Sequence, residues 1–186
     1  MNNKSTNIYL IRHGEAAENW SESRDPGLSE LGKQQSLDLL NNLIKRKSIK
    51  SIYTSPLKRA IETAIPLSNR LNIESLIESS YRELPSPQNL ENRAGWLLER
   101  MSETWSEQQH NLLQWRELAF QALQQLREDS VIFSHYMLIN AIVSCVTGNN
   151  NMVCFKPDNG SISHFKLSAG KLRLVSLGKE LNTTVN

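Results

Sequence analysis

The stretch YLIRHGEAAEN, residues 9–19, changes character abruptly after its third residue. Residues 8–11 are apolar or aromatic, which favours a short strand buried on both faces of a sheet. Arg12, His13 and Gly14 follow directly. A glycine permits a tight turn, and the active groups of parallel α/β sheets lie at the carboxyl ends of their strands. The stretch therefore predicts a functional loop directly after a central strand.

Two further segments, Ser51–Tyr53 and Val131–Phe133, share the apolar, β-rich character of residues 7–11. Because helical sequence separates these segments, they predict parallel strands joined by right-handed crossovers. Residues 161–177, SISHFKLSAGKLRLVSL, predict two antiparallel strands with a turn at Ser168–Gly170. We expect one α/β domain over residues 1–186, a three-layer α/β/α sandwich with a mostly parallel central sheet.

Two helices are expected, one between the first and second strands and one after the second strand. The first, within residues 28–47, begins with Ser29 as its N-cap and ends among basic residues. Its buried stripe is predicted to contain Leu37, Leu40 and Ile44. The second begins with Ser55 as its cap and Pro56 at the first helical position. Pro66 should interrupt and bend this second helix, because a mid-helix proline costs about 3 kcal/mol.

Composition restricts the class of protein. The 186 residues carry 21 Lys plus Arg and 19 Asp plus Glu, and this near balance argues against a nucleic-acid partner. No stretch approaches the roughly 18 apolar residues of a membrane span. Cys145 and Cys154 have neither CxxC spacing nor clustered histidines around them, which favours free thiols in a reducing compartment and argues against a zinc site. We expect a soluble cytoplasmic protein that binds no membrane.

Five segments in order resemble the histidine phosphatase superfamily, also called the phosphoglycerate mutase-like family. The resemblance runs from Ile8 to Asn140 and continues weakly into NGSISHFKL, residues 159–167. It implies the phosphoglycerate mutase-like fold. The segments that carry it are YLIRHGEAAEN (9–19), DPGLSELGKQQ (25–35), YTSPLKRAIETA (53–64), YRELP (81–85) and FSHYMLIN (133–140).

The resemblance assigns roles to four basic residues. His13 matches the family's nucleophile, which attacks phosphorus to form a phosphohistidine, and its other ring nitrogen should donate to a carbonyl near Gly14. Arg12 and Arg59 match two phosphate-clamping arginines, whose planar forks of donors suit phosphate better than a lysine does. His135 matches a second histidine that donates to the phosphate.

The leaving oxygen needs a proton, and Glu83 in YRELP matches the family's general acid. Beside a phosphate dianion the pKa of Glu83 should be raised, and a general acid contributes about 10²- to 10⁴-fold in rate. Glu15 is the competing carboxylate. It ranks lower because it follows the turn glycine, where backbone donors or an arginine lie closer than a leaving group. Asn19 matches an asparagine that contacts phosphate, although a role as a loop cap explains it nearly as well.

The chain departs from the family pattern after the second histidine. Tyr136 and Met137 stand where a small residue or a glycine pair is usual, and Tyr136 is expected to line and narrow the substrate site. The pair is also compatible with a member that has lost efficient turnover. Ala16 stands where the family usually has threonine or serine, so the hydroxyl of those residues is missing. The chain lacks the inserted length with which the cofactor-dependent mutases hold their intermediate, so hydrolysis is expected in place of transfer of the phosphoryl group back to the substrate. The reaction is expected to need neither a cofactor nor a metal.

Residues 89–129 predict helices that are rich in tryptophan, with Trp96, Trp105 and Trp115 packing either in the core or in a lid. A lid-like insert at about 84–115 should set specificity. The expected function is hydrolysis of a phosphate monoester on a small metabolite through a phosphohistidine. The alternatives are a phosphohistidine phosphatase that acts on a protein and a non-catalytic phosphate-binding domain. The sequence indicates neither the substrate nor the oligomeric state.

Overall fold

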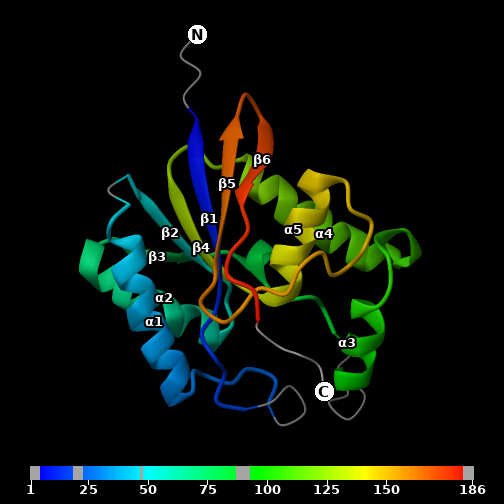
Figure 1. Cartoon of the computed structure of the whole chain (residues 1–186), viewed down its shortest axis with the longest axis horizontal. Helices are drawn as coiled ribbons and strands as arrows, with labels where there is room; N and C mark the ends of the chain where they lie inside the picture. The colour runs from blue at the N-terminus through cyan, green and yellow to red at the C-terminus, as the bar shows by residue number, and fades with distance from the viewer. Residues whose placement is uncertain (1–4, 19–22, 47, 87–92, 182–186) are drawn as a thin grey trace.

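A computed structural model describes residues 5–18, 23–46, 48–86 and 93–181 (Figure 1). Its sheet has six strands: β1 Thr6–Arg12, β2 Ser51–Thr54, β3 Ser75–Ile77, β4 Ser130–Ser134, β5 Ile162–Ser168 and β6 Lys171–Ser176. Its α-helices are α1 Glu30–Leu43, α2 Lys58–Leu71, α3 Arg93–Met101, α4 His110–Gln124 and α5 Tyr136–Thr147. Two 3₁₀ turns, η1 Ser79–Tyr81 and η2 Trp105–Glu107, complete the regular structure of these ranges.

The strands lie in the order β3-β2-β4-β1-β5-β6. The first four in this order run parallel to one another, and β5 and β6 extend the sheet by antiparallel pairing. The predicted turn between β5 and β6 is confirmed: Ala169 and Gly170 both have positive φ, as a two-residue hairpin turn requires. The expectation of a mostly parallel sheet is thus confirmed.

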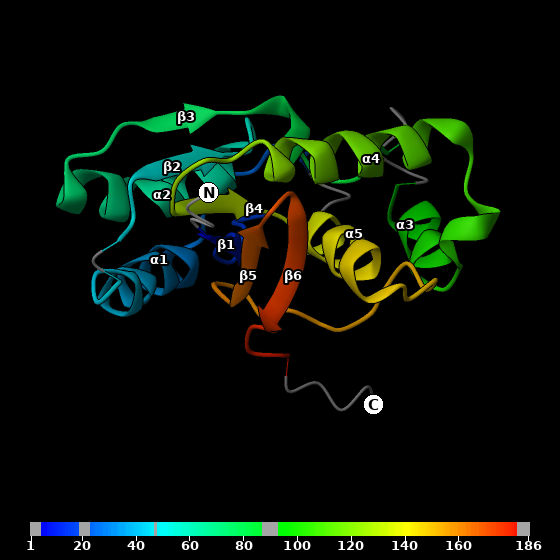
Figure 2. The same ribbon diagram turned by 90° about the horizontal axis from the view of Figure 1, so that it is seen from above.

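Successive side chains of the central strand β1 point to opposite faces of the sheet, and helices cover both faces, which produces the three layers. Ile8 and Leu10 of β1 belong to a core cluster with α4 and α5, whereas Tyr9 and Ile11 belong to a second cluster with α1 and α2. Figure 2 shows the two helix pairs on opposite sides of the sheet. A strand whose successive side chains all find apolar partners must be covered on both faces. The predicted α/β/α sandwich is confirmed.

Helix α1 has the expected N-cap but a different buried stripe. Ser29 accepts a hydrogen bond from the Gly32 amide at 3.0 Å, as predicted. Leu37 is exposed, and the fully buried stripe lies one residue earlier along each turn, at Gly32, Ser36, Leu39 and Leu43. The Ser36 hydroxyl donates to the Thr63 carbonyl of α2, so a polar side chain occupies a position in the contact between the helices. The pattern of leucines alone therefore predicted the wrong face.

Helix α2 begins and ends differently from the prediction. It starts at Lys58 with Leu57 at the N-cap position, so neither Ser55 nor Pro56 has the place predicted for it. The helix also runs through Pro66 to Leu71 without the expected interruption. Burial of its apolar face against the sheet offsets the cost of the proline; that face consists of Ala60, Ala64 and Leu67.

The tryptophan-rich region forms α3, η2 and α4. Trp105 is buried at the centre of a third core cluster, which confirms core packing for this residue. Trp115 stacks on Trp105 with ring centroids 6.4 Å apart, and its indole Nε1 donates to the Arg82 carbonyl at 3.2 Å. Within the described ranges, no helix combines the length and apolarity that crossing a bilayer requires.

Candidate active site

The carboxyl ends of three neighbouring parallel strands bring the predicted residues together. His13 follows β1, His135 follows β4 and Ser55 follows β2, and β4 lies between the other two strands. The imidazole centroids of His13 and His135 are 5.2 Å apart. Arg59, in the first turn of α2, donates from Nε to His13 Nε2 at 3.0 Å. Both histidines and Arg59 are buried, and the short distances between them make one compact cluster in which Arg59 carries the positive charge.

His13 is held in one orientation and one tautomer. Its Nδ1 lies 2.6 Å from the Gly14 carbonyl, which can only accept, so Nδ1 carries the proton. This confirms the expected contact near Gly14 and leaves the Nε2 lone pair facing Arg59. Burial, and then the charges of Arg59 and Arg12, hold the pKa of His13 well below its usual value. At neutral pH the ring is uncharged.

His135 is fully buried, and its Nε2 lies 2.7 Å from the hydroxyl of Ser55. Ser55 was predicted to be a helix cap, and its hydroxyl does accept from the Leu57 amide at 3.3 Å, but its second partner is the His135 imidazole. His135 Nδ1 has no hydrogen-bond partner among the described residues. Burial, together with the charge of Arg59, lowers the pKa of His135 well below its usual value.

The two predicted clamping arginines retain unused donors. Arg12 donates from Nη1 to the Pro157 carbonyl at 2.8 Å, and its guanidinium lies over the Tyr136 ring, 5.3 Å from the centroid. Arg59 Nη1 lies 4.0 Å from Asp25 Oδ1. Among the described residues, Arg12 Nε and Arg59 Nη2 are buried and lack a hydrogen-bond partner. An anion between the guanidiniums would satisfy these donors.

Glu83 is the buried carboxyl of the site. Its Oε1 accepts from the Leu84 amide at 2.8 Å, and its Oε2 accepts from the Met137 amide at 3.4 Å. Burial raises the pKa of Glu83, although Arg59 and both amides act in the opposite direction. The raised pKa was expected from a neighbouring phosphate dianion. In the structure burial alone supplies it.

The other sequence candidates lie as follows. Glu15 is exposed and accepts from the Ser29 hydroxyl at 2.7 Å, so its carboxylate is turned toward α1. Tyr136 lies under the Arg12 guanidinium at the edge of the site. Met137 is buried in the third core cluster, and its amide contacts Glu83. Asn19 lies outside the described residues.

Two positioning contacts escaped the sequence analysis. The Thr63 hydroxyl donates to the Arg59 carbonyl at 2.6 Å and accepts from the Gly14 amide at 3.0 Å, so it ties the loop after β1 to α2. The Asn159 amide group donates to the His13 carbonyl at 3.1 Å. The spacing of Thr63, one helical turn after Arg59, was a usable signal. Asn159 approaches from a loop distant in the sequence, and although it begins the segment NGSISHFKL, that weak resemblance assigned it no role.

Two cavities meet at Glu83, and each has the size of a small-molecule site. One encloses about 350 Å³ and is lined on its polar side by Arg24, Arg82 and Arg93. The other encloses about 330 Å³ and is mainly apolar, with Leu97, Met101 and Met137 among its walls, and it also includes Arg12 and Lys156. A ligand bound between the arginines and histidines therefore has room on both sides of the buried carboxyl.

The family model that describes the histidine phosphatase superfamily (branch 1) matches residues 8–180. The chain belongs to this superfamily. A relative from Hydrogenobacter thermophilus named "Putative phosphoserine phosphatase 2" is 25% identical over 95% of this chain and 97% of its own length. Phosphoserine phosphatase 1 of the same organism is 36% identical over 41% of this chain and 38% of its own length.

Solved structures show the same fold at low sequence identity. A mycobacterial glucosyl-3-phosphoglycerate phosphatase superposes with a TM-score of 0.75 at 19% identity, covering 95% of this chain and 100% of its own. Phosphoserine phosphatase from Entamoeba histolytica, in complex with 3-phosphoglyceric acid, superposes with a TM-score of 0.73 at 21% identity, covering 94% of this chain and 97% of its own. The predicted fold and family are confirmed.

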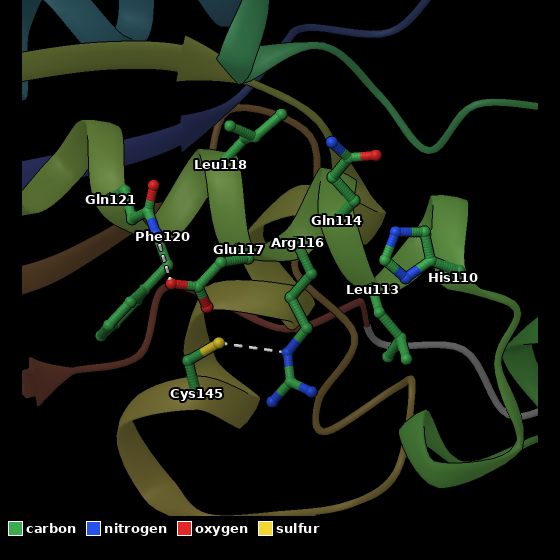
Figure 3. A pocket seen from close by; sticks show the side chains of 9 residues that line it. All are labelled: His110, Leu113, Gln114, Arg116, Glu117, Leu118, Phe120, Gln121 and Cys145. Atoms are coloured by element: carbon green, nitrogen blue, oxygen red, sulfur yellow. Dashed lines mark hydrogen bonds between the residues drawn. The ribbon is translucent and has the colours of Figure 1, made fainter.

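This histidine phosphatase has a larger hollow away from His13 and His135. It encloses about 750 Å³ along α4 and includes Cys145 of α5 (Figure 3). Arg116 lines the hollow, donates from Nε to Cys145 Sγ at 3.1 Å and lies over the Trp105 ring. His110, the first residue of α4, is also among the residues that line it. None of the residues that line this hollow belongs to the histidine and arginine cluster.

Replacing Gly32 with alanine should disturb the site of this histidine phosphatase by displacing the loop that carries His13 and Glu15. A Cβ atom there would lie 2.1 Å from the Glu15 carbonyl oxygen, which is backbone and moves only with the loop that carries His13. We expect destabilisation by about 1–3 kcal/mol and reduced activity. Gly95→Ala in exposed α3, where an added Cβ meets nothing within 4 Å, is the control. Denaturant unfolding and phosphate release measure both variants; a Gly32→Ala protein that equals Gly95→Ala would contradict the close approach.

Proposed function

We propose that this protein hydrolyses the phosphate monoester of a small phosphorylated metabolite through a phosphohistidine on His13, without a metal ion or other cofactor. One observation carries the proposal. The His13 imidazole is neutral, is fixed in the Nδ1–H tautomer, and presents Nε2 to a buried cluster of two guanidiniums and a second imidazole. An oriented lone pair within a site of this charge is suited to attack a phosphoryl group.

In the first step His13 Nε2 forms a bond to phosphorus, and the bond from phosphorus to the ester oxygen breaks. Arg59 exchanges its hydrogen bond to His13 for one to a phosphoryl oxygen, and the unused donors of Arg12 and Arg59 stabilise the charge of the transition state. Protonated Glu83 gives its proton to the departing alkoxide, a role that its raised pKa supports.

His135 is proposed to donate from Nδ1 to a phosphoryl oxygen. For this the neutral ring must accept at Nε2, and the Ser55 hydroxyl at 2.7 Å is placed to donate there. Ser55 would thereby set the tautomer of His135 in the same way that the Gly14 carbonyl sets that of His13. Both imidazoles act uncharged, in agreement with their lowered pKa values.

In the second step a water molecule attacks phosphorus from the side that the alcohol has left. Glu83, now a carboxylate, takes a proton from the water, and the electron pair of the phosphorus–nitrogen bond returns to His13 Nε2. Inorganic phosphate departs, and Glu83 is again protonated for the next turnover. The same carboxyl thus serves as acid and then as base.

The size of the surroundings favours a small substrate over a protein loop. Cavities of about 350 and 330 Å³ flank Glu83, and α3 lines them through Arg93, Leu97 and Met101, while Trp105 of the neighbouring turn η2 packs in the core cluster that Leu97 and Met101 contact. We propose that this segment acts as the lid-like insert expected from the sequence. Relatives named for phosphoserine and for glucosyl-3-phosphoglycerate support a metabolite of similar size.

The test is phosphate release from p-nitrophenyl phosphate in excess EDTA. We expect turnover that EDTA leaves unchanged, because each step above uses only side chains of this protein. Loss of activity in EDTA that is restored by added divalent metal would contradict the metal-independent route. Binding of inorganic phosphate without any hydrolysis would instead support the non-catalytic alternative.

A further inference from the structure

The two ring nitrogens of His13 are held by two separate parts of the chain. The Gly14 carbonyl, in the loop after β1, lies 2.6 Å from Nδ1, and Arg59, in the first turn of α2, donates from Nε to Nε2 at 3.0 Å. The direction of the imidazole ring therefore depends on how the loop after β1 is placed relative to α2. Each contact is a single hydrogen bond, so this placement needs further support from the surrounding structure.

The Thr63 hydroxyl bonds to the backbone of both partners. It donates to the Arg59 carbonyl at 2.6 Å and accepts from the Gly14 amide at 3.0 Å. A carbonyl only accepts and an amide N–H only donates, so one orientation of the hydroxyl proton satisfies both bonds. Thr63 is 1% exposed, so water has no ready access to replace either bond. A single oxygen atom thus joins the two residues that hold His13.

The two bonds of the Thr63 hydroxyl differ in how far other contacts replace them. Arg59 lies inside α2, where its carbonyl also accepts the helix's own bond from the amide four residues later. Among the described residues, Thr63 is the single hydrogen-bond partner of the Gly14 amide, and Gly14 is buried. Without the hydroxyl, this amide is left unpaired in the interior, and the cost of an unpaired buried amide favours a displaced loop.

The peptide that joins His13 to Gly14 is held at both edges. Its N–H donates to Thr63, and its carbonyl accepts from the Asn159 side chain at 3.1 Å. In the proposed first step Arg59 exchanges its bond to His13 for one to a phosphoryl oxygen, so at the moment of attack the contacts on the Gly14 side direct the ring. A reacting atom that is misplaced by about 1 Å can cost about 10²-fold in rate.

We infer that Thr63 is a positioning residue, whose hydroxyl keeps the Gly14 backbone and Arg59 in the relative placement at which His13 Nε2 points at the phosphoryl group. The inference rests on the proposed function and adds to it a side chain that is bonded to backbone and not to the imidazole. Ser36 of α1 supports Thr63 in turn, because its hydroxyl donates to the Thr63 carbonyl at 2.9 Å.

Thr63→Val removes the hydroxyl and retains the branched shape of the side chain. We expect the rate of phosphohistidine formation, measured as the first release of nitrophenolate from p-nitrophenyl phosphate, to fall by about 10- to 100-fold. Thr63→Ser keeps the hydroxyl and should restore most of the rate. Thr54→Val is the matched control and should leave the rate unchanged, because Thr54 is fully buried and its hydroxyl has no hydrogen-bond partner among the described residues.

The proton on His13 Nδ1 reports the same placement without catalysis. In a bond of 2.6 Å to the Gly14 carbonyl, this proton should resonate far downfield in the NMR spectrum and exchange slowly with water. We expect the resonance, identified by its absence in His13→Ala, to move upfield in Thr63→Val and to keep its position in Thr63→Ser and Thr54→Val. A general loss of stability would not move one ring proton of the folded protein, so the shift separates positioning from a structural role.

A Thr63→Val protein that matches Thr54→Val in both rate and ring-proton position would overturn the inference. So would a Thr63→Ser protein as slow as Thr63→Val, because the hydroxyl would then not be the group that matters. If Thr63→Val does not fold, Thr63→Ala, which leaves more room beside the Gly14 amide, is compared with Thr54→Ala by the same criteria. If no ester is hydrolysed, the proposed function fails, and the ring-proton position alone decides the inference.

Discussion

His13→Ala should abolish turnover, with kcat lowered by about 10³- to 10⁶-fold, the range seen when a covalent nucleophile is removed. The neutral Nε2 of His13 is the group proposed to bond to phosphorus, and Arg12, Arg59 and His135 surround it without supplying an equivalent lone pair. The variant should fold, because its side chain lies at the carboxyl end of β1 and outside the apolar clusters. Phosphate release measures turnover, and near-ultraviolet circular dichroism measures folding of the variant.

His164→Ala is the matched control for this variant. His164 stacks on Tyr9 with ring centroids 4.7 Å apart and contacts the Asn7 side chain, on a strand next to β1 but away from the site. Its removal should leave kcat unchanged. Free imidazole added to His13→Ala should restore part of the activity by entering the vacated space. A His13→Ala protein with the activity of the control would show that another group attacks phosphorus.

Glu83→Gln should lower kcat by about 10²- to 10⁴-fold on an alkyl phosphate, because the alkoxide then leaves without a proton. The loss on p-nitrophenyl phosphate should be much smaller in the first step, since nitrophenolate departs readily without protonation. Glu15→Gln serves as the control, because Glu15 is exposed and bonded to Ser29. Equal losses on the two esters in the rate of the first step, measured as release of the alcohol or of nitrophenolate before the phosphohistidine is hydrolysed, would argue against Glu83 as the proton donor.

The pH profile provides an independent check on Glu83. Its pKa is raised by burial, so the protonated acid persists to higher pH than it would for an exposed glutamate, and the rate on an alkyl phosphate should fall as pH rises through that raised pKa. The Gln variant should lack this alkaline limb, because its amide does not titrate. A limb that remains in Glu83→Gln would belong to another group.

The parts of the site that the sequence predicted are those in which a local pattern determines a position in the fold. Because Arg12 and His13 follow an apolar strand, they are predicted to lie at the edge of the sheet where the carboxyl ends of the parallel strands meet. The fold class followed from the spacing of three such strands. The contact between His13 Nδ1 and the Gly14 carbonyl followed from the family resemblance, and the structure contains it.

The errors arose where tertiary contacts override a local preference. Serine is a residue type that commonly caps helices, and Ser55 was predicted to do so. Because Ser55 is buried beside His135, its hydroxyl also contacts the His135 imidazole. Ser36 is buried in place of Leu37, because α1 packs closely against α2 through small residues. Strand β3 escaped prediction because its three residues lie at the sheet edge with Leu76 and Ile77 exposed, so burial leaves no pattern in them.

The bulky residues after His135 have a structural explanation. Tyr136 supports the Arg12 guanidinium with the face of its ring, and Met137 fills the third core cluster while its amide bonds to Glu83. The Tyr136 ring and the Met137 backbone amide thus hold groups that the proposed mechanism uses. Their presence is compatible with full turnover.

Chemical trapping of the intermediate tests the central claim most directly. The protein is mixed with a phosphate ester, quenched in alkali within one turnover, digested, and examined by mass spectrometry for a phosphoryl group. We predict one acid-labile, alkali-stable phosphoryl group on the peptide that contains His13, and none in His13→Ala. A phosphoryl group on another residue, or rapid phosphate release with no phosphorylated peptide at any time, would contradict the covalent route.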